Sequence, residues 1–222
     1  MDNVLLAVMD SESLPKSGFV FELTVVLCTL GSKKIGTKRT YAIKDMIDQC
    51  IPDQKIQKCL LTCTHRMTLM EALRDIEHWV TRAHKGRQVV FVAHALDRDL
   101  GFISNTYRAL YGKEYTSFDF MPKFHKVCSQ CLVMTQCPDF LKIHPGFGVD
   151  VTLERCLQRI GRPPGSQTHS SLQDCLDLID VLDFLVSVYR IQIPGPTHLH
   201  KVDPKELSIH ERKVACGLVE SV

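Results

Sequence analysis

Apolar runs near the start of the chain predict a small antiparallel sheet. Residues 4–9 are wholly apolar, and residues 19–30 are rich in the Val, Phe, Leu and Thr that favour strands. The turn-prone residues 31–34 separate this second run from a third over residues 35–43. We therefore expect a meander of three strands. Its basic residues are expected to lie in solvent near the hairpin tip: Lys33, Lys34, Lys38 and Arg39.

From residue 68 onward the apolar positions change to helical spacing. Leu69, Ile76 and Val80 belong to a series that recurs at intervals of three and four, after a Thr68 that can cap the helix with Glu71. Residues 88–93 form a short β-branched and aromatic run, typical of a central strand covered on both faces. Further helices are predicted up to residue 110, over residues 153–160 and over residues 172–188, where Val188 is expected on the apolar side.

This order of elements predicts an α/β protein with a sheet of mixed direction. Folds of this kind place their chemistry at the ends of central strands. The compact domain is expected to span residues 1–193. Residues 194–222 begin with Pro194-Gly195-Pro196 and are expected to form a tail, with one short helix near residues 206–216.

The composition is that of an ordinary globular domain. The 222 residues are 45% hydrophobic and 23% charged, which argues against extensive disorder, and the formal net charge is +2. Any phosphate-binding surface must therefore be local. We find no secretory signal and no apolar run of the roughly 20 residues that a membrane helix needs, so we expect an intracellular protein of the cytoplasm or nucleus, without a membrane partner. The ten cysteines are expected to be reduced thiols, most of them buried.

Two carboxylates follow the first strand directly. Asp10 and Glu12 are two residues apart, so strand geometry puts both side chains on the same face. Two carboxylates held so close repel each other, and oxygen-only ligands of this kind suit Mg²⁺ or Mn²⁺. The alternative is a polar turn in which Asp10 and Glu12 are simply solvated.

Further acidic residues stand at the starts of two predicted helices. Asp99 follows the central strand, where it can also act as a helix N-cap. His169 precedes the last long helix and Asp174 lies in its opening turns, so both can face one point. Asp174 begins a series with a spacing of three residues, which drifts around a helix. The later members are therefore expected on its solvated surface: Asp177, Asp180 and Asp183.

A group of cysteines and histidines has the spacing of a structural zinc site. Cys128 and Cys131 form a Cys-x-x-Cys pair, with Cys137 as a third ligand and His125 or His144 as a fourth. The matching second Cys-x-x-Cys is missing. The alternative is a strand around Val127 and Leu132 that carries core thiols.

Three motifs resemble those of a known family. Met9-Asp10-Ser11-Glu12-Ser13 resembles hydrophobic-Asp-x-Glu-Thr, and residues 92–103 resemble V-x-H-N-x-x-F-D-x-x-F-L. His169-Ser170-Ser171-Leu172-Gln173-Asp174 resembles H-x-A-x-x-D. On these motifs the chain, over about residues 4–190, resembles the DEDDh-type 3′–5′ exonucleases of the proofreading superfamily. The resemblance implies a ribonuclease H-like fold with a mixed five-stranded sheet flanked by helices.

The same resemblance implies a site of five residues: Asp10, Glu12, Asp99, His169 and Asp174. The four carboxylates would hold two Mg²⁺ or Mn²⁺ ions, with Asp10 bridging both, and His169 would act as general base. Asp97 competes with Asp99 for its role, but the spacing from Asp99 to Phe102-Ile103 matches the family motif. Three positions depart from the motifs: Ser13 replaces the usual Thr, Ala95 an Asn and Arg98 a Phe.

The leading hypothesis is therefore a metal-dependent 3′–5′ exonuclease that acts on the 3′ end of DNA or RNA. One alternative is a catalytically silent nucleic-acid-binding or interaction domain on the same fold. Another is a zinc-stabilised interaction module in which the acidic residues are incidental. The sequence does not distinguish DNA from RNA or predict an oligomeric state.

Overall fold

The structure is a computed structural model that describes residues 4–30, 34–47, 56–57, 61, 63–116, 119–137, 140, 151–167 and 170–193. The turn predicted at residues 31–34 lies largely outside these residues, and the tail predicted over residues 194–222 lies wholly outside them. Among the described residues, no helix is both long and apolar enough to cross a membrane.

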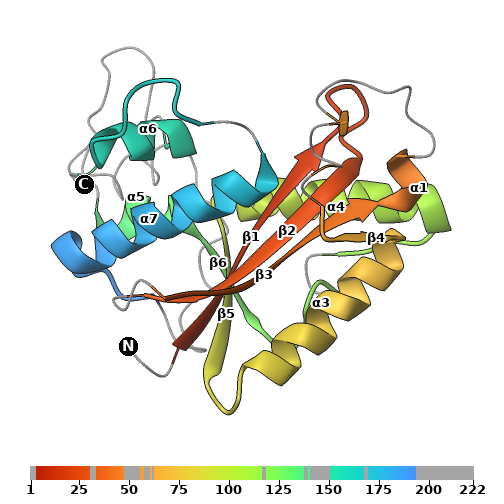
Figure 1. The fold of residues 1–222 in the computed structure, drawn as a ribbon, viewed down its shortest axis with the longest axis horizontal. Coiled ribbons are helices and arrows are strands. Elements are labelled where there is room, and N and C mark those ends of the chain that lie inside the picture. The colour runs from red at the N-terminus through yellow and green to blue at the C-terminus, as the bar shows by residue number, and fades with distance from the viewer. Residues whose placement is uncertain are drawn as a thin grey trace, which may run out of the picture.

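A mixed sheet of six strands, in the order β4-β3-β2-β1-β5-β6, forms the centre of the fold (Figure 1). The predicted meander is present as β1 (Val4–Ser13), β2 (Val20–Thr29) and β3 (Lys34–Ile43), with antiparallel pairing. β5 (Gln88–Ala93) runs parallel to β1, and β6 (His125–Cys128) runs parallel to β5. The predicted mixed architecture is confirmed, and a three-residue strand, β4 (His65–Met67), adds a sixth member beside β3.

Helices cover both faces of this sheet (Figure 1). α3 (Leu69–Ala83) and α4 (Leu96–Tyr111) pack on one face. α5 (Ser129–Gln136), α6 (Leu153–Arg159) and α7 (Ser171–Tyr189) pack on the other, and a single turn, α1 (Lys44–Ile47), follows β3. Successive β1 side chains alternate between two buried clusters, with Met9 toward α3 and α4 and Val8 toward α7. By the same alternation, Asp10 and Glu12 continue the α7 side of the strand.

Local sequence signals explain where α3 and α4 begin. The predicted capping box of α3 is present, because Thr68 accepts a hydrogen bond from the Glu71 N–H while its own N–H donates to the Glu71 carboxylate at 2.9 Å. α4 begins at Leu96, which places Asp99 in its first turn rather than at its N-cap.

The last long helix differs from its prediction at two positions. Val188, expected on the apolar side of α7, is 58% exposed. Asp177, expected in solvent, is buried, and its carboxylate accepts a hydrogen bond from Gln173 at 2.9 Å. The start of α7 packs so closely over β1 and β2 that polar residues in its first turns are also enclosed.

Candidate functional site

Carboxylates from three elements meet at the end of β1. Asp10 and Glu12 come from β1 and Asp174 from the first turn of α7, and each offers an oxygen within 4.8 Å of the others. Asp99 adds a fourth carboxylate from α4, and the Ser11 hydroxyl donates a 2.6 Å hydrogen bond to it. Residues that are 164 positions apart in the chain, Asp10 and Asp174, are thus brought together by the sheet and its helices.

Burial and repulsion by neighbouring carboxylates disfavour the charged forms of Asp10 and Asp99. Burial raises the pKa of Asp10 well above its ordinary value, and the charges of Asp99, Asp174 and Glu12 raise it further, against a smaller opposing effect of Arg98. Burial also raises the pKa of Asp99 to about 6, although the Ser11 hydrogen bond opposes the shift. Crowded carboxylates of this kind are the oxygen ligands that Mg²⁺ or Mn²⁺ would neutralise, so the residues present fit such ions.

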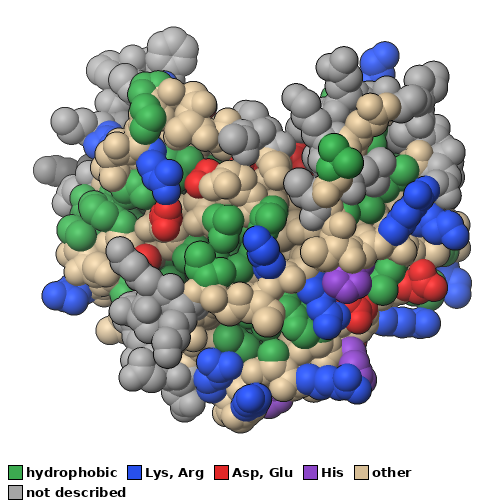
Figure 2. All heavy atoms as spheres, in the orientation of Figure 1, with side chains coloured by type: hydrophobic (Ala, Val, Ile, Leu, Met, Phe, Trp, Pro, Cys, Tyr) green, Lys and Arg blue, Asp and Glu red, His purple; other side chains and the backbone are tan. Residues whose placement is uncertain are grey.

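The cluster lies in the wall of a cleft of about 370 Å³. In Figure 2 the surface is hollowed between the part that carries α6 and the part that carries the ends of β1 and β2, and acidic side chains show in the hollow. Asp97 is exposed and does not line this cleft, whereas Asp99 does. Other lining residues offer polar and apolar surface to a ligand: Ser13, Arg98, Phe102, Gln130, Leu153 and Gln167. Gln167 also donates a 2.9 Å hydrogen bond to the Asp174 carboxylate.

His94 holds part of the cleft lining in place, a role that the sequence did not reveal. It follows β5 directly and is 6% exposed. Its Nε2–H donates to the Val151 carbonyl at 2.6 Å, and its Nδ1 accepts from the Ser129 hydroxyl at 2.9 Å. Burial lowers the pKa of His94 to about 4, so the ring is neutral at neutral pH. It therefore ties the starts of α5 and α6 to the central strand.

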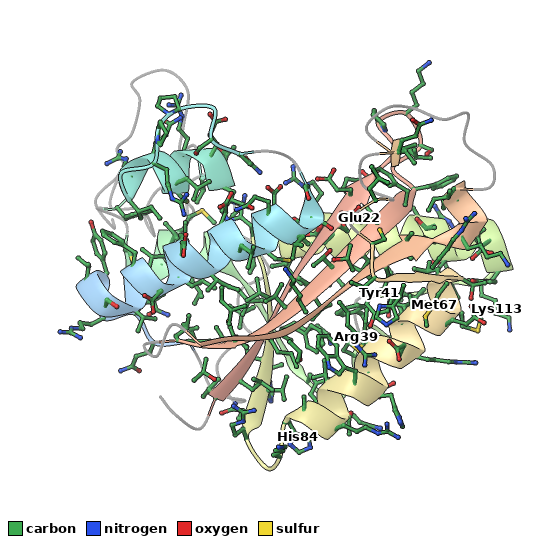
Figure 3. All side chains as sticks on the ribbon, viewed as in Figure 1. Glu22, Arg39, Tyr41, Met67, His84 and Lys113 are labelled. Atoms are coloured by element: carbon green, nitrogen blue, oxygen red, sulfur yellow. The ribbon has the colours of Figure 1, made fainter. Side chains whose placement is uncertain are left out.

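Glu22 is a second buried residue that the sequence analysis missed. It lies on β2 directly opposite Glu12, and it is 1% exposed. Figure 3 shows it at the start of α7, where its carboxylate accepts a hydrogen bond from the Ser171 hydroxyl. A 2.6 Å hydrogen bond also joins the Ser171 and Thr24 hydroxyls, and one of 3.0 Å joins the Thr24 and Thr40 hydroxyls. This polar chain anchors the first turn of α7, and hence Asp174, to the sheet.

The remaining predicted site residues are not brought together in the described part of the chain. His169 and His144 lie outside the described residues. Cys128 ends β6 and Cys131 lies in the first turn of α5, whereas Cys137 follows the last residue of that eight-residue helix. Because an α-helix rises about 1.5 Å per residue, the two ends of α5 are roughly 12 Å apart. Cysteines at opposite ends of the helix are therefore too far apart to bind one zinc ion. Leu132, expected on a strand, is on α5. Among the described residues, His125, Cys128, Cys131 and Cys137 do not form a convergent group of three ligands.

The mixed sheet and its two helical layers match the ribonuclease H-like fold seen in solved DEDDh exonuclease domains. The chain is similar to the nuclease domain of 3′hExo, a DEDDh family member solved with rAMP, at 15% identity and a TM-score of 0.59 over 86% of this chain and 96% of that one. It is also similar to a 3′-exonuclease solved in a study of histone mRNA stem-loop recognition, at 14% identity and a TM-score of 0.61, over 82% of this chain and 81% of that one.

A third similar structure is cell-death related nuclease 4, at 13% identity and a TM-score of 0.57, over 82% of this chain and 64% of that one. No protein-family model and no curated protein sequence matches the chain. At these identities the likeness establishes the fold.

Proposed function

We propose that the protein is a metal-dependent 3′–5′ exonuclease that hydrolyses phosphodiester bonds of DNA or RNA. The observation that carries the proposal is the convergence of Asp10, Glu12, Asp99 and Asp174 from three elements on one cleft. Burial and repulsion raise the pKa of Asp10 and of Asp99, so the cluster favours a partner that supplies positive charge. The fold shared with DEDDh exonucleases supports the same reaction class.

Each carboxylate has a defined task in this proposal. Asp10, whose pKa responds to the other three carboxylates, would bridge two Mg²⁺ or Mn²⁺ ions. Glu12 and Asp174 would complete one ion site, and Asp99, held by Ser11, would support the other. When bound, the ions would neutralise the charge that develops on the attacking and leaving oxygens of the phosphodiester.

His169 is the proposed general base. It immediately precedes Ser170, the N-cap of α7, and the helix then presents Asp174 in its first turn. A neutral imidazole can take the proton of the attacking water at neutral pH, a task that no carboxylate engaged with metal ions performs as well. Removal of the His169 ring should therefore lower kcat selectively.

The activity is tested by incubating the protein with end-labelled single- and double-stranded DNA and RNA, with Mg²⁺, Mn²⁺ or chelator. We expect a ladder that shortens from the 3′ end, in the presence of metal only, and the substrate that gives it identifies the polymer. Binding without any cleavage, in every metal, would instead favour the catalytically silent domain.

The role of His169 is tested by His169→Ala, with His78→Ala on the exposed surface of α3 as the matched control. We expect kcat to fall about 10²–10⁴-fold in His169→Ala, with nucleic-acid affinity in Ca²⁺ retained. His78→Ala should cleave at the wild-type rate. Wild-type turnover in His169→Ala would remove the base from the proposal while leaving the carboxylates in place.

A further inference from the structure

Cys128 and Cys131 form a pair of thiols at the junction of β6 and α5. Cys128 is the N-cap of α5 and Cys131 is its third residue, a spacing at which the cap side chain reaches the first turn. Both residues are reduced and partly exposed. The Cys131 thiol is placed to donate to the Cys128 sulfur, whose own S–H donates to the His94 carbonyl at 3.5 Å. The pair thus has the Cys-x-x-Cys spacing and the helix start at which reactive thiols occur.

The surroundings of Cys128 favour its thiolate. The Cys131 hydrogen bond has the largest effect and outweighs burial, and the backbone N–H groups of Cys131, Leu96 and Gln130 add to it, so that the pKa falls to about 7. Leu96 and Gln130 belong to the first turns of different helices, α4 and α5. Other cysteines show the opposite behaviour, because burial raises the pKa of Cys137 to about 11 and of Cys28 to about 12.

We propose that Cys128 and Cys131 are a redox-active dithiol that closes reversibly to an intramolecular disulfide. The oxidant is a low-molecular-weight disulfide. The Cys128 thiolate attacks one of its sulfurs, breaks the S–S bond and releases one thiolate. Cys131 then loses its proton and attacks the Cys128 sulfur of the mixed disulfide, which releases the second thiolate. Two protein thiols are oxidised, and one small disulfide is reduced to two thiols.

Closure of this disulfide constrains the first turn of α5. The bond ties the side chain of Cys128, at the extended N-cap position, to Cys131 and holds their Cβ atoms about 3.5–4.5 Å apart. The constrained turn carries Ser129, which bonds His94, and Gln130, which lines the cleft and donates to the Val151 carbonyl at 3.4 Å. Oxidation therefore alters the cleft wall, and it lowers exonuclease turnover; this last consequence rests on the proposed function.

The reactivity of Cys128 is tested without any nucleic acid, by alkylation of the full chain with iodoacetamide as a function of pH, followed by peptide mapping. We expect the rate at Cys128 to rise with a midpoint near pH 7, at least 1.5 pH units below an ordinary thiol (about 8.5). Cys131→Ser keeps a hydrogen-bond donor and should keep this midpoint, whereas Cys131→Ala should raise it. A midpoint near that of an ordinary thiol in the wild type would overturn the proposal.

The disulfide itself is tested in mixtures of reduced and oxidised glutathione. We expect a Cys128–Cys131 disulfide in the wild type, and a persistent mixed disulfide on Cys128 in Cys131→Ser, because the resolving thiol is gone. Cys137→Ser, at the other end of α5, should behave like the wild type. The proposal fails if no Cys128–Cys131 disulfide forms at any ratio, or if the purified protein holds about one equivalent of zinc that Cys128→Ser releases.

The link to the cleft is tested by comparing cleavage by the oxidised and reduced forms of the same preparation. We expect the oxidised wild type to cleave severalfold more slowly, with recovery after reduction, and Cys128→Ser, which forms neither the mixed nor the internal disulfide, to be insensitive to the disulfide ratio. Equal rates in the two wild-type forms would overturn this coupling. Absence of cleavage in the reduced form would overturn the proposed function instead, and the alkylation and mapping results would stand.

Discussion

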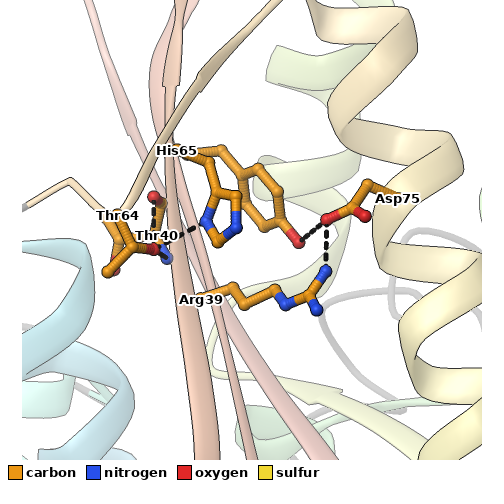
Figure 4. Close-up of polar contacts among 6 residues, drawn as sticks. Arg39, Thr40, Thr64, His65 and Asp75 are labelled. Atoms are coloured by element: carbon orange, nitrogen blue, oxygen red, sulfur yellow. Dashed lines mark hydrogen bonds and ion pairs between the residues drawn. The ribbon is translucent and has the colours of Figure 1, made fainter.

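The protein places a cluster of ionisable side chains on each face of its sheet, and the two clusters have opposite electrostatic character. On the α7 face, Asp10, Glu12 and Asp174 share one sign of charge. On the α3 face, Asp75 accepts from Arg39 at 2.5 Å and from the Tyr41 hydroxyl at 2.8 Å (Figure 4).

Aromatic rings complete the cluster on the α3 face. The Arg39 guanidinium lies 4.8 Å from the centre of the Trp79 ring, and Tyr41 stacks on His65 with ring centres 5.1 Å apart. Every charge in this cluster therefore has a partner within the protein, and a cation–π contact adds to the ion pair.

The pKa values of Asp75 and Asp10 shift in opposite directions, in line with the different surroundings of the two clusters. Burial tends to raise the pKa of Asp75, but hydrogen bonds from Tyr41 and Arg39, together with the Arg39 charge, bring it below its ordinary value. Burial and neighbouring carboxylates raise the pKa of Asp10 instead. The α3 cluster is satisfied within the fold and stabilises it, whereas burial and repulsion in the α7 cluster favour the binding of protons or cations, as expected of a functional site.

The largest expected effect comes from removing one charge of the acidic cluster. Under the proposed function, Asp10→Asn should reduce 3′-end hydrolysis about 10³-fold or more, because the ligand proposed to bridge the two ions would be lost. The melting temperature of the metal-free protein should stay the same or rise, since repulsion among the remaining carboxylates is relieved. Asp97→Asn, two residues before Asp99 but exposed, is the matched control and should keep wild-type activity and melting temperature. Equal losses in both variants would contradict the assignment.

Removing metal should make stability depend on pH in a defined direction. The folded-state pKa of Asp99, about 6, is above its ordinary value of 3.8. The protonated carboxyl group therefore stabilises the metal-free fold fully below pH 4, and this contribution, about 3 kcal/mol, is lost as the pH rises to about 6. Thermal melts in chelator should show this loss, and Asp99→Asn should reduce it. Added Mn²⁺ should raise the melting temperature above pH 6 and not below pH 4, where Asp10 and Asp99 are protonated. A metal effect independent of pH would argue against carboxylate ligands.

Much of the fold and part of the site follow from local sequence. The period-two placement of Asp10 and Glu12 and the Thr68 capping box depend on neighbouring residues only, and the structure contains both. The preference for Asp99 over Asp97 rests on a family resemblance, and its metal role stays a prediction. The structure places Asp99 and not Asp97 in the cleft lining, because residues two apart on a helix point in very different directions.

The features that sequence reasoning missed have partners far away in the chain. Glu22 interrupts an otherwise apolar strand, a signal that it is buried and bonded, but its partner Ser171 is 149 residues away. The His94 partner Val151 is 57 residues away. Arg39 was expected in solvent with its basic neighbours, yet the Asp75 ion pair and the Trp79 ring hold it against α3. Hydrophobic periodicity does not contain such long-range pairings.

A smaller effect is expected from breaking the satisfied cluster. Asp75→Ala should lower the free energy of unfolding by about 1–2 kcal/mol, because the buried Tyr41 hydroxyl loses its acceptor. Glu77→Ala on the same helix removes an exposed ion pair with Lys123 at 3.4 Å and should have little effect. Chemical denaturation measures both variants, and 3′-end hydrolysis by the folded fraction should be unchanged in each. A loss of turnover in Asp75→Ala greater than its loss of folded protein would show that the two clusters are coupled.

The smallest expected effect concerns Arg98. Its positive charge opposes the rise in the pKa of Asp10, and its side chain lines the cleft. Under the proposed function, its guanidinium would contact a substrate phosphate. Arg98→Ala should raise KM about fivefold, the equivalent of roughly 1 kcal/mol for an exposed charge pair, with kcat little changed. The dependence of KM on salt should also weaken by about one unit of log–log slope, since one phosphate contact is lost. Arg98→Lys keeps the charge and should keep most of the salt dependence, whereas Arg98→Phe should lose it as Arg98→Ala does. If Arg98→Ala lowers kcat and leaves KM and its salt dependence intact, Arg98 acts on the carboxylates rather than on the substrate.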